Sequence, residues 1–408
     1  MQKLILALFI ITAASPLFGK QIRVNENGKS IQQAVFESMI GDTITIASGH
    51  YYPGEININK QLTILGENFP VLEAKQPGEI FLVTANRVTI KWITFENVTR
   101  SFIKDYAAIK LENVTDCLIE NNKLINNFFG IYLAKSSGCE IKDNYITSNG
   151  EQESNSGNGI HLWSSRDNNI HNNIISGHRD GIYLEFAKHC LVSGNLSKSS
   201  LRYGLHFMFS DSCKYSKNTF EHNGAGVAVM YSRQIHMENN VFKNNSGAAS
   251  FGILLKDIRD SRIINNTITN NSIGIFIEGS SRLIVKHNTF SRNGWALKLM
   301  ANSMDNRFSR NNFIANTFDI TTNSRKNFNT IDSNYWGNYA GYDINKDGFG
   351  ELPYHPVSLF SYVVAQNPPL LILLHSFFMN LLDLAERIIP VLTPAELIDK
   401  HPSMKFIV

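Results

Sequence analysis

The sequence predicts an all-β fold, a right-handed parallel β-helix, and three observations support this prediction. An asparagine recurs at steps of 22 or 23 residues, apart from one step of 29 and one of 26. Apolar residues usually stand three positions before it and two positions after it, and a Gly-apolar-x-apolar run completes most repeats. A period held this long indicates a solenoid in which each repeat is one coil. The recurring asparagines are Asn122, Asn144, Asn173, Asn195, Asn218, Asn240, Asn266, Asn288, Asn311 and Asn334.

Each repeat reads as three short strands with tight corners. Apolar and polar residues alternate over a few positions, and Asn or Gly separates the runs, as in Gly204-Leu205-His206-Phe207. No helical period lies between the strands, which argues against leucine-rich repeats. Parallel coils would stack at roughly 5 Å, the usual strand spacing, so we expect the asparagine amides to form an internal ladder. The step of 29 residues contains a polar loop at residues 148–156, a candidate for partner contact.

The N-terminal end is predicted to be processed and capped. Residues 1–19 resemble a secretory signal, with Lys3, an apolar stretch over residues 4–14 and a plausible cleavage site. The apolar stretch is short for a membrane span, so we expect the mature chain to leave the cytoplasm. Residues 20–60 are predicted to form an N-terminal cap with a short helix at residues 30–36, followed by the first coil. Residues 61–356 then form the β-helix.

Residues 357–408 are predicted to be a C-terminal helical docking segment. The apolar run at residues 370–389 reads as a helix, and Thr393 and Pro394 are typical of the start of another. Charged positions such as Asp383 and Glu386 argue against a membrane span. Two interpretations stay open, and both can hold: a cap over the last coil, or a tail that docks on a membrane partner or a lipid surface.

Composition excludes some classes of function. There are 38 Lys and Arg against 35 Asp and Glu, and a net charge of +3 is too small to indicate nucleic-acid binding. The chain has no Lys/Arg run, no Gly-rich phosphate loop and no zinc-type cysteine spacing.

The four cysteines, Cys117, Cys139, Cys190 and Cys213, each precede a repeat asparagine by five residues, so they share one column. Neighbours stacked in register point the same way, which would strain a disulfide. We favour a ladder of small buried side chains. Reactive thiols or a copper-thiolate site are the functional alternative.

The strand after each repeat glycine predicts an unusual outer face. Its first outward column holds Tyr132, His161, Tyr183, His206 and Ala228, and its second holds Ala134, Trp163, Glu185, Met208 and Met230. Thioether and imidazole together suit Cu(I). The candidate copper ligands are His206, Met208, Met230, His161 and Glu185. The alternative is a protein-docking surface, since Ala228, Leu254 and Phe276 continue the first column as an apolar stripe.

A calcium-like loop follows the last coil. Asp343, Asn345 and Asp347 take positions one, three and five of such a loop, with Gly348 at six and Glu351 at nine. The twelfth position is Tyr354 instead of Glu, so the loop is not a complete EF-hand. The alternative is an Asp/Asn/Gly turn that ends the solenoid.

Several runs resemble the NosD family, accessory proteins for nitrous oxide reductase maturation. These are residues 202–210, 223–232, 252–257, 293–299, 334–348 and 354–357, of which Arg-Tyr-Gly-Leu-His-Phe-Met-Phe-Ser at 202–210 is the most specific. The resemblance covers nearly the whole mature chain. It implies a periplasmic protein held at the inner membrane by the permease of an ABC transporter, which also has a cytoplasmic ATPase. The implied task is delivery of copper, and of sulfur as a further candidate, to the reductase, with a copper chaperone as another partner.

The competing class is a carbohydrate-active enzyme, since many β-helices cleave or epimerise acidic polysaccharides. Such a site needs clustered carboxylates with a base on one outer face. The outer columns offer only isolated acids, namely Glu185, Glu278 and Asp257 beside Lys256. We therefore expect that the protein is not an enzyme.

Overall fold

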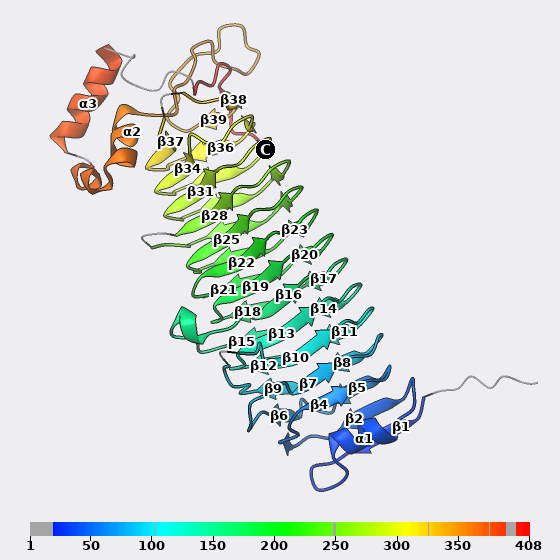
Figure 1. Ribbon diagram of the computed structural model, residues 1–408. Coiled ribbons are helices and arrows are strands. Elements are labelled where there is room, and N and C mark those ends of the chain that lie inside the picture. The colour runs from blue at the N-terminus through cyan, green and yellow to red at the C-terminus, as the bar shows by residue number, and fades with distance from the viewer. Residues whose placement is uncertain (1–18, 102, 248–249, 325, 375, 389–396) are drawn as a thin grey trace, which may run out of the picture.

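The chain winds into a long solenoid, with its N-terminal strands at one end and three helical segments at the other (Figure 1). The structure is a computed structural model that describes residues 19–101, 103–247, 250–324, 326–374, 376–388 and 397–408. The predicted signal, residues 1–19, lies outside the described residues except for Gly19. None of the described helices is long and apolar enough to cross a membrane.

Three parallel sheets form the sides of the solenoid. Each strand pairs in parallel with its counterparts on the neighbouring coils, and this confirms the predicted parallel β-helix. The 14-stranded sheet A contains β1 (Gln21–Val24), β2 (Thr43–Ile46), β5 (Thr63–Gly66), β8 (Thr89–Lys91), β11 (Leu118–Glu120), β14 (Glu140–Lys142), β17 (Asn169–His171), β20 (Leu191–Ser193), β23 (Lys214–Ser216), β26 (His236–Glu238), β29 (Arg262–Ile264), β32 (Ile284–Lys286), β35 (Arg307–Ser309) and β38 (Thr330–Asp332).

The other two sheets have 13 and 12 strands. Sheet B contains β3 (His50–Tyr51), β6 (Val71–Glu73), β9 (Thr94–Glu96), β12 (Lys123–Ile125), β15 (Tyr145–Thr147), β18 (Ile174–Ser176), β21 (Leu196–Lys198), β24 (Thr219–Glu221), β27 (Val241–Lys243), β30 (Thr267–Thr269), β33 (Thr289–Ser291), β36 (Asn312–Ile314) and β39 (Tyr335–Trp336). Sheet C contains β4 (Ile56–Ile58), β7 (Phe81–Val83), β10 (Ala107–Glu112), β13 (Phe129–Ala134), β16 (Ile160–Trp163), β19 (Asp180–Glu185), β22 (Tyr203–Met208), β25 (Ala225–Met230), β28 (Phe251–Lys256), β31 (Ile273–Glu278), β34 (Trp295–Leu299) and β37 (Phe318–Thr322).

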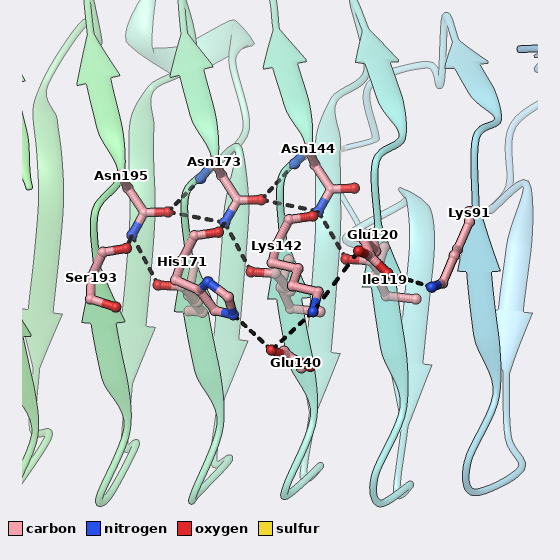
Figure 2. A network of polar contacts seen from close by, with 12 residues as sticks. Lys91, Ile119, Glu120, Glu140, Lys142, Asn144, His171, Asn173, Ser193 and Asn195 are labelled. Carbon is pink, nitrogen blue, oxygen red and sulfur yellow. Dashed lines mark hydrogen bonds and ion pairs between the residues drawn. The ribbon is translucent and has the colours of Figure 1, made fainter.

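The recurring asparagines form the expected internal ladder. The side-chain oxygen of Asn173 accepts from both the backbone N–H and the amide of Asn144, each at 3.0 Å, and Asn195 does the same for Asn173 (Figure 2). An amide both donates and accepts, so identical side chains on successive coils satisfy each other. Beside the ladder, on the outer face of sheet A, Glu140 accepts from His171 at 2.8 Å and lies 3.4 Å from the Lys142 ammonium (Figure 2).

A second asparagine ladder runs along the next corner, five residues after the first-ladder asparagine in the repeats from Asn218 to Asn311. Asn223, Asn245, Asn271, Asn293 and Asn316 are linked oxygen to amide on successive coils. Both ladders are buried, and they hold the corners between apolar strands whose inner residues are almost fully buried. Buried backbone groups at these corners therefore find partners without water.

The N-terminal end is covered by a short helix, α1 (Ile31–Glu37), where the sequence predicts one. Ser30 caps it by accepting from the backbone N–H of Gln33. Ile31, Ala34 and Val35 form the buried face of α1, so the helix shields the edge of the first coils.

The C-terminal segment differs in detail from the prediction. It begins with α2 (Leu359–Gln366), which the sequence reading missed, and continues with the 3-10 segment η2 (Pro368–Leu373) and helix α3 (Phe377–Ile388). The predicted helix over 370–389 is therefore wrong in its first turns, because Pro368 and Pro369 start a 3-10 segment instead. Phe360 and Val364 of α2 pack against Phe318 of β37. The predicted helix start at Thr393 lies outside the described residues.

The chain then returns to close the asparagine ladder. The fully buried Asp399 accepts from the backbone N–H of Asn334 at 2.9 Å, from its amide at 3.2 Å and from the indole N–H of Trp336 at 3.0 Å. Asp399 thus takes the place that the asparagine of a further coil would occupy, and the last donors of the ladder stay satisfied.

Candidate functional site

The two outward columns expected from the sequence are register columns of sheet C. His161 of β16 pairs with Tyr183 of β19, which pairs with His206 of β22 and then with Ala228 of β25. The second column follows the same strands, with Glu185 beside Met208 and Met208 beside Met230. The candidate copper residues therefore come from four consecutive coils on one face.

The first column is a stack of rings. The ring centroids of His161 and Tyr183 are 4.7 Å apart, and those of Tyr183 and His206 are 4.4 Å apart with 9° between their planes. Tyr203 lies 4.9 Å from His206 at a tilted angle. His161 and His206 are only 5% and 3% exposed, although they point away from the core. The rings cover each other, so the two imidazoles lie in a much drier environment than an outer face normally provides.

The second column places the thioethers beside this stack. Met208 and Met230 are half-buried. The Tyr183 hydroxyl donates to the sulfur of Met208 at 3.4 Å, which ties the two columns together. On the coil after His206, the first column holds only the buried methyl group of Ala228. A small side chain here leaves His206, Met208 and Met230 without a bulky neighbour between them.

His206 is held at one nitrogen and free at the other. Its Nδ1 lies 3.4 Å from Asp180 Oδ2, while its buried Nε2 has no hydrogen-bond partner among the described residues. Burial lowers the pKa of His206, although the carboxylate of Asp180 acts in the opposite direction. The imidazole is thus neutral near pH 7. A neutral histidine with one nitrogen bonded to a carboxylate and the other unused fits a metal ligand.

Asp180 is fully buried at the start of β19 and has three neighbours that donate to it. Arg202 donates from Nε to Oδ1 at 2.9 Å and from Nη2 to Oδ2 at 2.5 Å, and the backbone N–H of Tyr203 donates at 3.3 Å. Burial alone would raise the pKa of Asp180, but the hydrogen bonds from His206 and Arg202 lower it to about 2. The carboxylate is therefore ionised and can only accept.

His161 has a similar but looser environment. Its Nδ1 lies 3.4 Å from the amide nitrogen of Asn158, and its Nε2 lies 3.8 Å from Glu185 Oε2, too far for a hydrogen bond. The nearby imidazole lowers the pKa of Glu185. His161 and Glu185 are thus close together, but they are separated from His206 by the Tyr183 ring.

The residue types fit copper better than a hard cation. The described residues bring together no group of three or more His, Cys, Asp and Glu side chains that could hold a metal ion. The imidazole and thioether set of His206, Met208 and Met230 lies outside that class, and it is the set that suits Cu(I).

The calcium-like loop is folded around its own acidic side chains. Asp343 accepts from the backbone N–H groups of Asp347 and Gly348, and Glu351 accepts from those of Ile344 and Asn345. The two carboxylates thus bind backbone N–H groups of their own exposed turn. Calcium binding by Asp343, Asn345, Asp347 and Glu351 stays a prediction.

The four cysteines are buried, as the predicted column of small side chains requires. All are free thiols and almost fully buried, and the backbone N–H of Cys190 points to the sulfur of Cys213 at 3.4 Å. The thiols pack inside the solenoid, away from the imidazole stack on its outer face.

Sequence reasoning missed the contribution of Asp180 and Arg202 to this face. The two outward columns did not include Asp180, whereas the structure makes it the first, buried residue of β19, in register with Tyr203. The signal was present, because Asp180 stands directly before a repeat glycine and Arg202 precedes the matching position on the next coil.

A cavity of about 440 Å³ lies beside the stack, over the first coils of sheet C. Glu55, Glu79, Lys110, Tyr132 and Trp163 contribute to its lining. Lys110 donates to Glu79 at 2.9 Å, and burial together with the carboxylate of Glu79 raises the pKa of Glu55. The outer columns predicted from the sequence did not include this pair of neighbouring acids.

Comparisons with known proteins give a family and a fold. Residues 146–346 match the family described as periplasmic copper-binding protein (NosD), and residues 21–175 match a right handed beta helix region. A protein named probable ABC transporter binding protein NosD from Stutzerimonas stutzeri is 26% identical over 374 residues, which cover 87% of this chain and 85% of the relative. Its namesake from Pseudomonas aeruginosa is 27% identical over 421 residues, which cover 98% and 94%.

Solved structures agree on the architecture. A family 28 exopolygalacturonase from Yersinia enterocolitica superposes with a TM-score of 0.63 over 77% of this chain and 78% of its own, at 12% sequence identity. At such low identity the likeness shows the fold alone.

Proposed function

The chain is a NosD-family protein, as its motifs predict, and we propose that it is a periplasmic accessory protein for the maturation of nitrous oxide reductase. In this proposal Cu(I) is cargo that the protein holds in transit. His206, Met208 and Met230 form its site, and His161 and Glu185 lie beside it. The family description, periplasmic copper-binding protein, supports both the compartment and the ion.

The observation that carries the proposal is the buried, unpartnered Nε2 of His206 beside two half-buried thioethers. An unpaired polar atom in a dry site is costly, so its retention favours a ligand that completes it. Thioethers are weak ligands that release Cu(I) readily when a better set arrives, which suits transfer more than storage.

The partners follow from the names of the relatives and from the C-terminal end. Both relatives are named ABC transporter binding proteins, and we propose an ABC-type permease with its ATPase as the membrane partner. Helix α3 exposes Phe377, Leu381 and Leu384, apolar side chains that a partner would cover. A copper chaperone would supply the ion and nitrous oxide reductase would receive it.

We propose no enzymatic activity. The two relatives that match 87% and 98% of this chain are both named binding proteins. A Glu79→Gln variant that abolished a measurable cleavage or epimerisation of an acidic polysaccharide would overturn this point.

The test is a Cu(I) titration of the mature protein against a competing chromophoric chelator under anaerobic conditions. We expect one tightly bound Cu(I), lost in the triple variant His206→Ala, Met208→Ala, Met230→Ala. Met300→Ala is the matched control, because Met300 follows the last residue of β34 further along the same face and lies several coils from the site. Equal binding by the wild type and the triple variant would contradict the proposed site, and no binding by the wild type would contradict copper carriage altogether.

A further inference from the structure

Three aromatic residues are exposed side by side at the corner that follows sheet C. Phe186, Phe209 and Tyr231, the aromatic ridge, come directly after β19, β22 and β25 on three consecutive coils. Their ring centroids are 5.2 and 5.1 Å apart, with 7° and 16° between the planes. The three side chains are 48%, 41% and 43% exposed, so a large part of each one faces solvent.

The fold does not require aromatic side chains at this corner. All three residues have a left-handed backbone, with φ of 52°, 51° and 51°, a conformation that is unfavourable for bulky side chains. Ser164 has the equivalent position on the preceding coil and Asp257 on the following one, with the same left-handed backbone. Smaller or polar residues therefore suffice for the turn. Exposed rings in an unfavourable backbone conformation indicate contact with another molecule.

The stacking of the ridge favours a protein as that molecule. The ring planes are nearly parallel, so the inner ring faces lie against one another and mainly ring edges remain for a partner. Nucleobases, and planar ligands in general, need an open ring face for stacking. Apolar side chains of a protein pack readily against ring edges.

A column of mostly basic residues runs beside the ridge, two residues further along each coil. It consists of Arg166, Lys188, Asp211, Arg233 and Arg259. Arg166 lies 3.8 Å from Asp167, and Arg233 is paired with Asp211 at 3.1 Å. The exposed Lys188 and Arg259 have no ion-pair partner among the described residues. These two cations therefore complement carboxylates on a partner.

Two recesses of about 540 Å³ each open beside the ridge, with Asp211 in the lining of both. Phe186 and Lys188 line the first, and Tyr231 and Arg259 line the second. Each recess thus combines an exposed ring with one of the two cations. A carboxylate next to an apolar contact fits this combination.

The surface is long enough for a folded partner. The coils of Ser164 and Gly279, which line the outer ends of the two recesses, are five coil steps apart. At the usual strand spacing this is about 24 Å. A standard protein interface of about 800 Å² per partner is about 28 Å across, so the ridge and its recesses match the length of one such contact.

The ridge lies next to the candidate copper ligands. Phe209 and Tyr231 directly follow Met208 and Met230, and the backbone N–H of Phe209 donates to the carbonyl of Met230 at 3.2 Å. A protein on the ridge therefore lies beside the two half-buried thioethers. Thioethers are weak ligands that give up Cu(I) to a stronger set, so a protein in this place is positioned to take the ion.

We propose that the aromatic ridge is the docking site of the protein that receives copper, and that this partner presents an apolar contact surrounded by carboxylates. The apolar contact packs against the ring edges, and the carboxylates pair with Lys188 and Arg259. The inference rests on the proposed function for the identity of the partner, nitrous oxide reductase. Docking itself is measured with copper-free proteins, so it does not depend on copper binding.

The test is bio-layer interferometry with the full-length mature protein immobilised and copper-free nitrous oxide reductase from the same cells in solution. Replacing the ridge by Phe186→Ser, Phe209→Ser and Tyr231→Ser should weaken binding at least about tenfold, because exposed aromatic anchors carry much of the energy of an interface. The fold should persist, since Ser164 already has this backbone conformation at the equivalent position. Circular dichroism and the Cu(I) titration should match the wild type.

A second variant tests the charges. Lys188→Glu with Arg259→Glu should slow association about tenfold or more at low salt, because like charges then face the carboxylates of the partner. The association rate of the wild type should also fall as salt is added.

The matched control is Trp92→Ser with Tyr145→Ser, which removes aromatic side chains that are 42% and 45% exposed away from sheet C. Trp92 also has a left-handed backbone, with φ of 60°. This variant should bind the reductase like the wild type.

No binding of the reductase by the wild type, or equal binding by the wild type and the ridge variant, would overturn the inference. Ridge-dependent binding of the copper chaperone but not of the reductase would overturn it too, because the ridge would then serve the donor. Ridge-dependent binding of the reductase by a wild type that holds no Cu(I) would support the docking site and contradict only the proposed copper carriage.

Discussion

At the scale of single residues, the imidazole stack depends on a charge that never reaches solvent. Asp180 is fully buried, yet it stays ionised because Arg202, His206 and a backbone N–H surround it. A buried carboxylate without such partners would take up a proton. The same contacts that stabilise the charge also connect β19 to β22 at the centre of the candidate copper site.

The ionisation of Asp180 predicts a pH dependence of stability. Its pKa is lowered from 3.8 to about 2 in the folded protein, so it stabilises the fold above its unfolded pKa, and this contribution disappears as the pH falls from about 4 through about 2. The linked contribution is about 2 kcal/mol. Urea unfolding of the wild type and of Asp180→Asn should therefore differ most above pH 4, and the difference should shrink toward pH 2. A difference that stays constant over this range would show that the carboxylate is not ionised in the fold.

At the scale of elements, the asparagine ladders provide hydrogen-bond partners for the corners, which the hydrogen bonds between short strands do not reach. Strands of three residues in sheets A and B leave their corners with backbone groups that face inward. Ladder asparagines satisfy such groups on the preceding coil. Asn218, for example, accepts from the N–H of Asn195 at 2.9 Å and donates to the carbonyl of Val192 at 3.0 Å.

Removing one rung of the ladder should be costly. Asn218→Ala removes the acceptor of the buried Asn195 N–H and the amide donor to the carbonyl of Val192, so we expect a loss of about 3 kcal/mol in the free energy of unfolding. Lys198→Ala, on β21 of the neighbouring coil, is the control, because its side chain is only partly buried, and it should change stability by less than about 0.5 kcal/mol. Chemical denaturation measures both. Equal stability of the two variants would mean that water enters the ladder and replaces the amide.

The period of the sequence was sufficient to predict the coils, the first ladder and the register of the outer columns, because one repeat unit determines the position of every equivalent residue. The second ladder was missed although it follows the first at a constant offset of five residues, because His178 and Ser200 interrupt the asparagines at that position. The period could not show that His161 and His206 are buried, because that depends on ring contacts between coils. Asp399 could not be placed either, since its partner Asn334 is 65 residues away.

At the scale of the whole molecule, the candidate copper site and the helical end are far apart along the solenoid. The site lies on β16, β19, β22 and β25 in the middle of the solenoid, while α2 and α3 lie at its end (Figure 1). Each coil of a solenoid contacts only the two adjacent coils, so a change at one end leaves distant coils intact. The proposed docking and the proposed ion binding should therefore be separable by mutation.

The separation predicts variants that lose one function and keep the other. Leu381→Asp with Leu384→Asp changes two exposed apolar side chains of α3, so the fold and the Cu(I) affinity should stay unchanged. Binding to proteoliposomes that contain the ABC permease and ATPase should fall at least tenfold, because charged side chains in a covered apolar contact lose their hydration without gaining a partner. The triple variant at His206, Met208 and Met230 should show the reverse pattern. Flotation with the proteoliposomes measures docking, and empty vesicles of the same lipids are the control: wild-type binding to empty vesicles would assign α3 to the lipid surface instead of the permease.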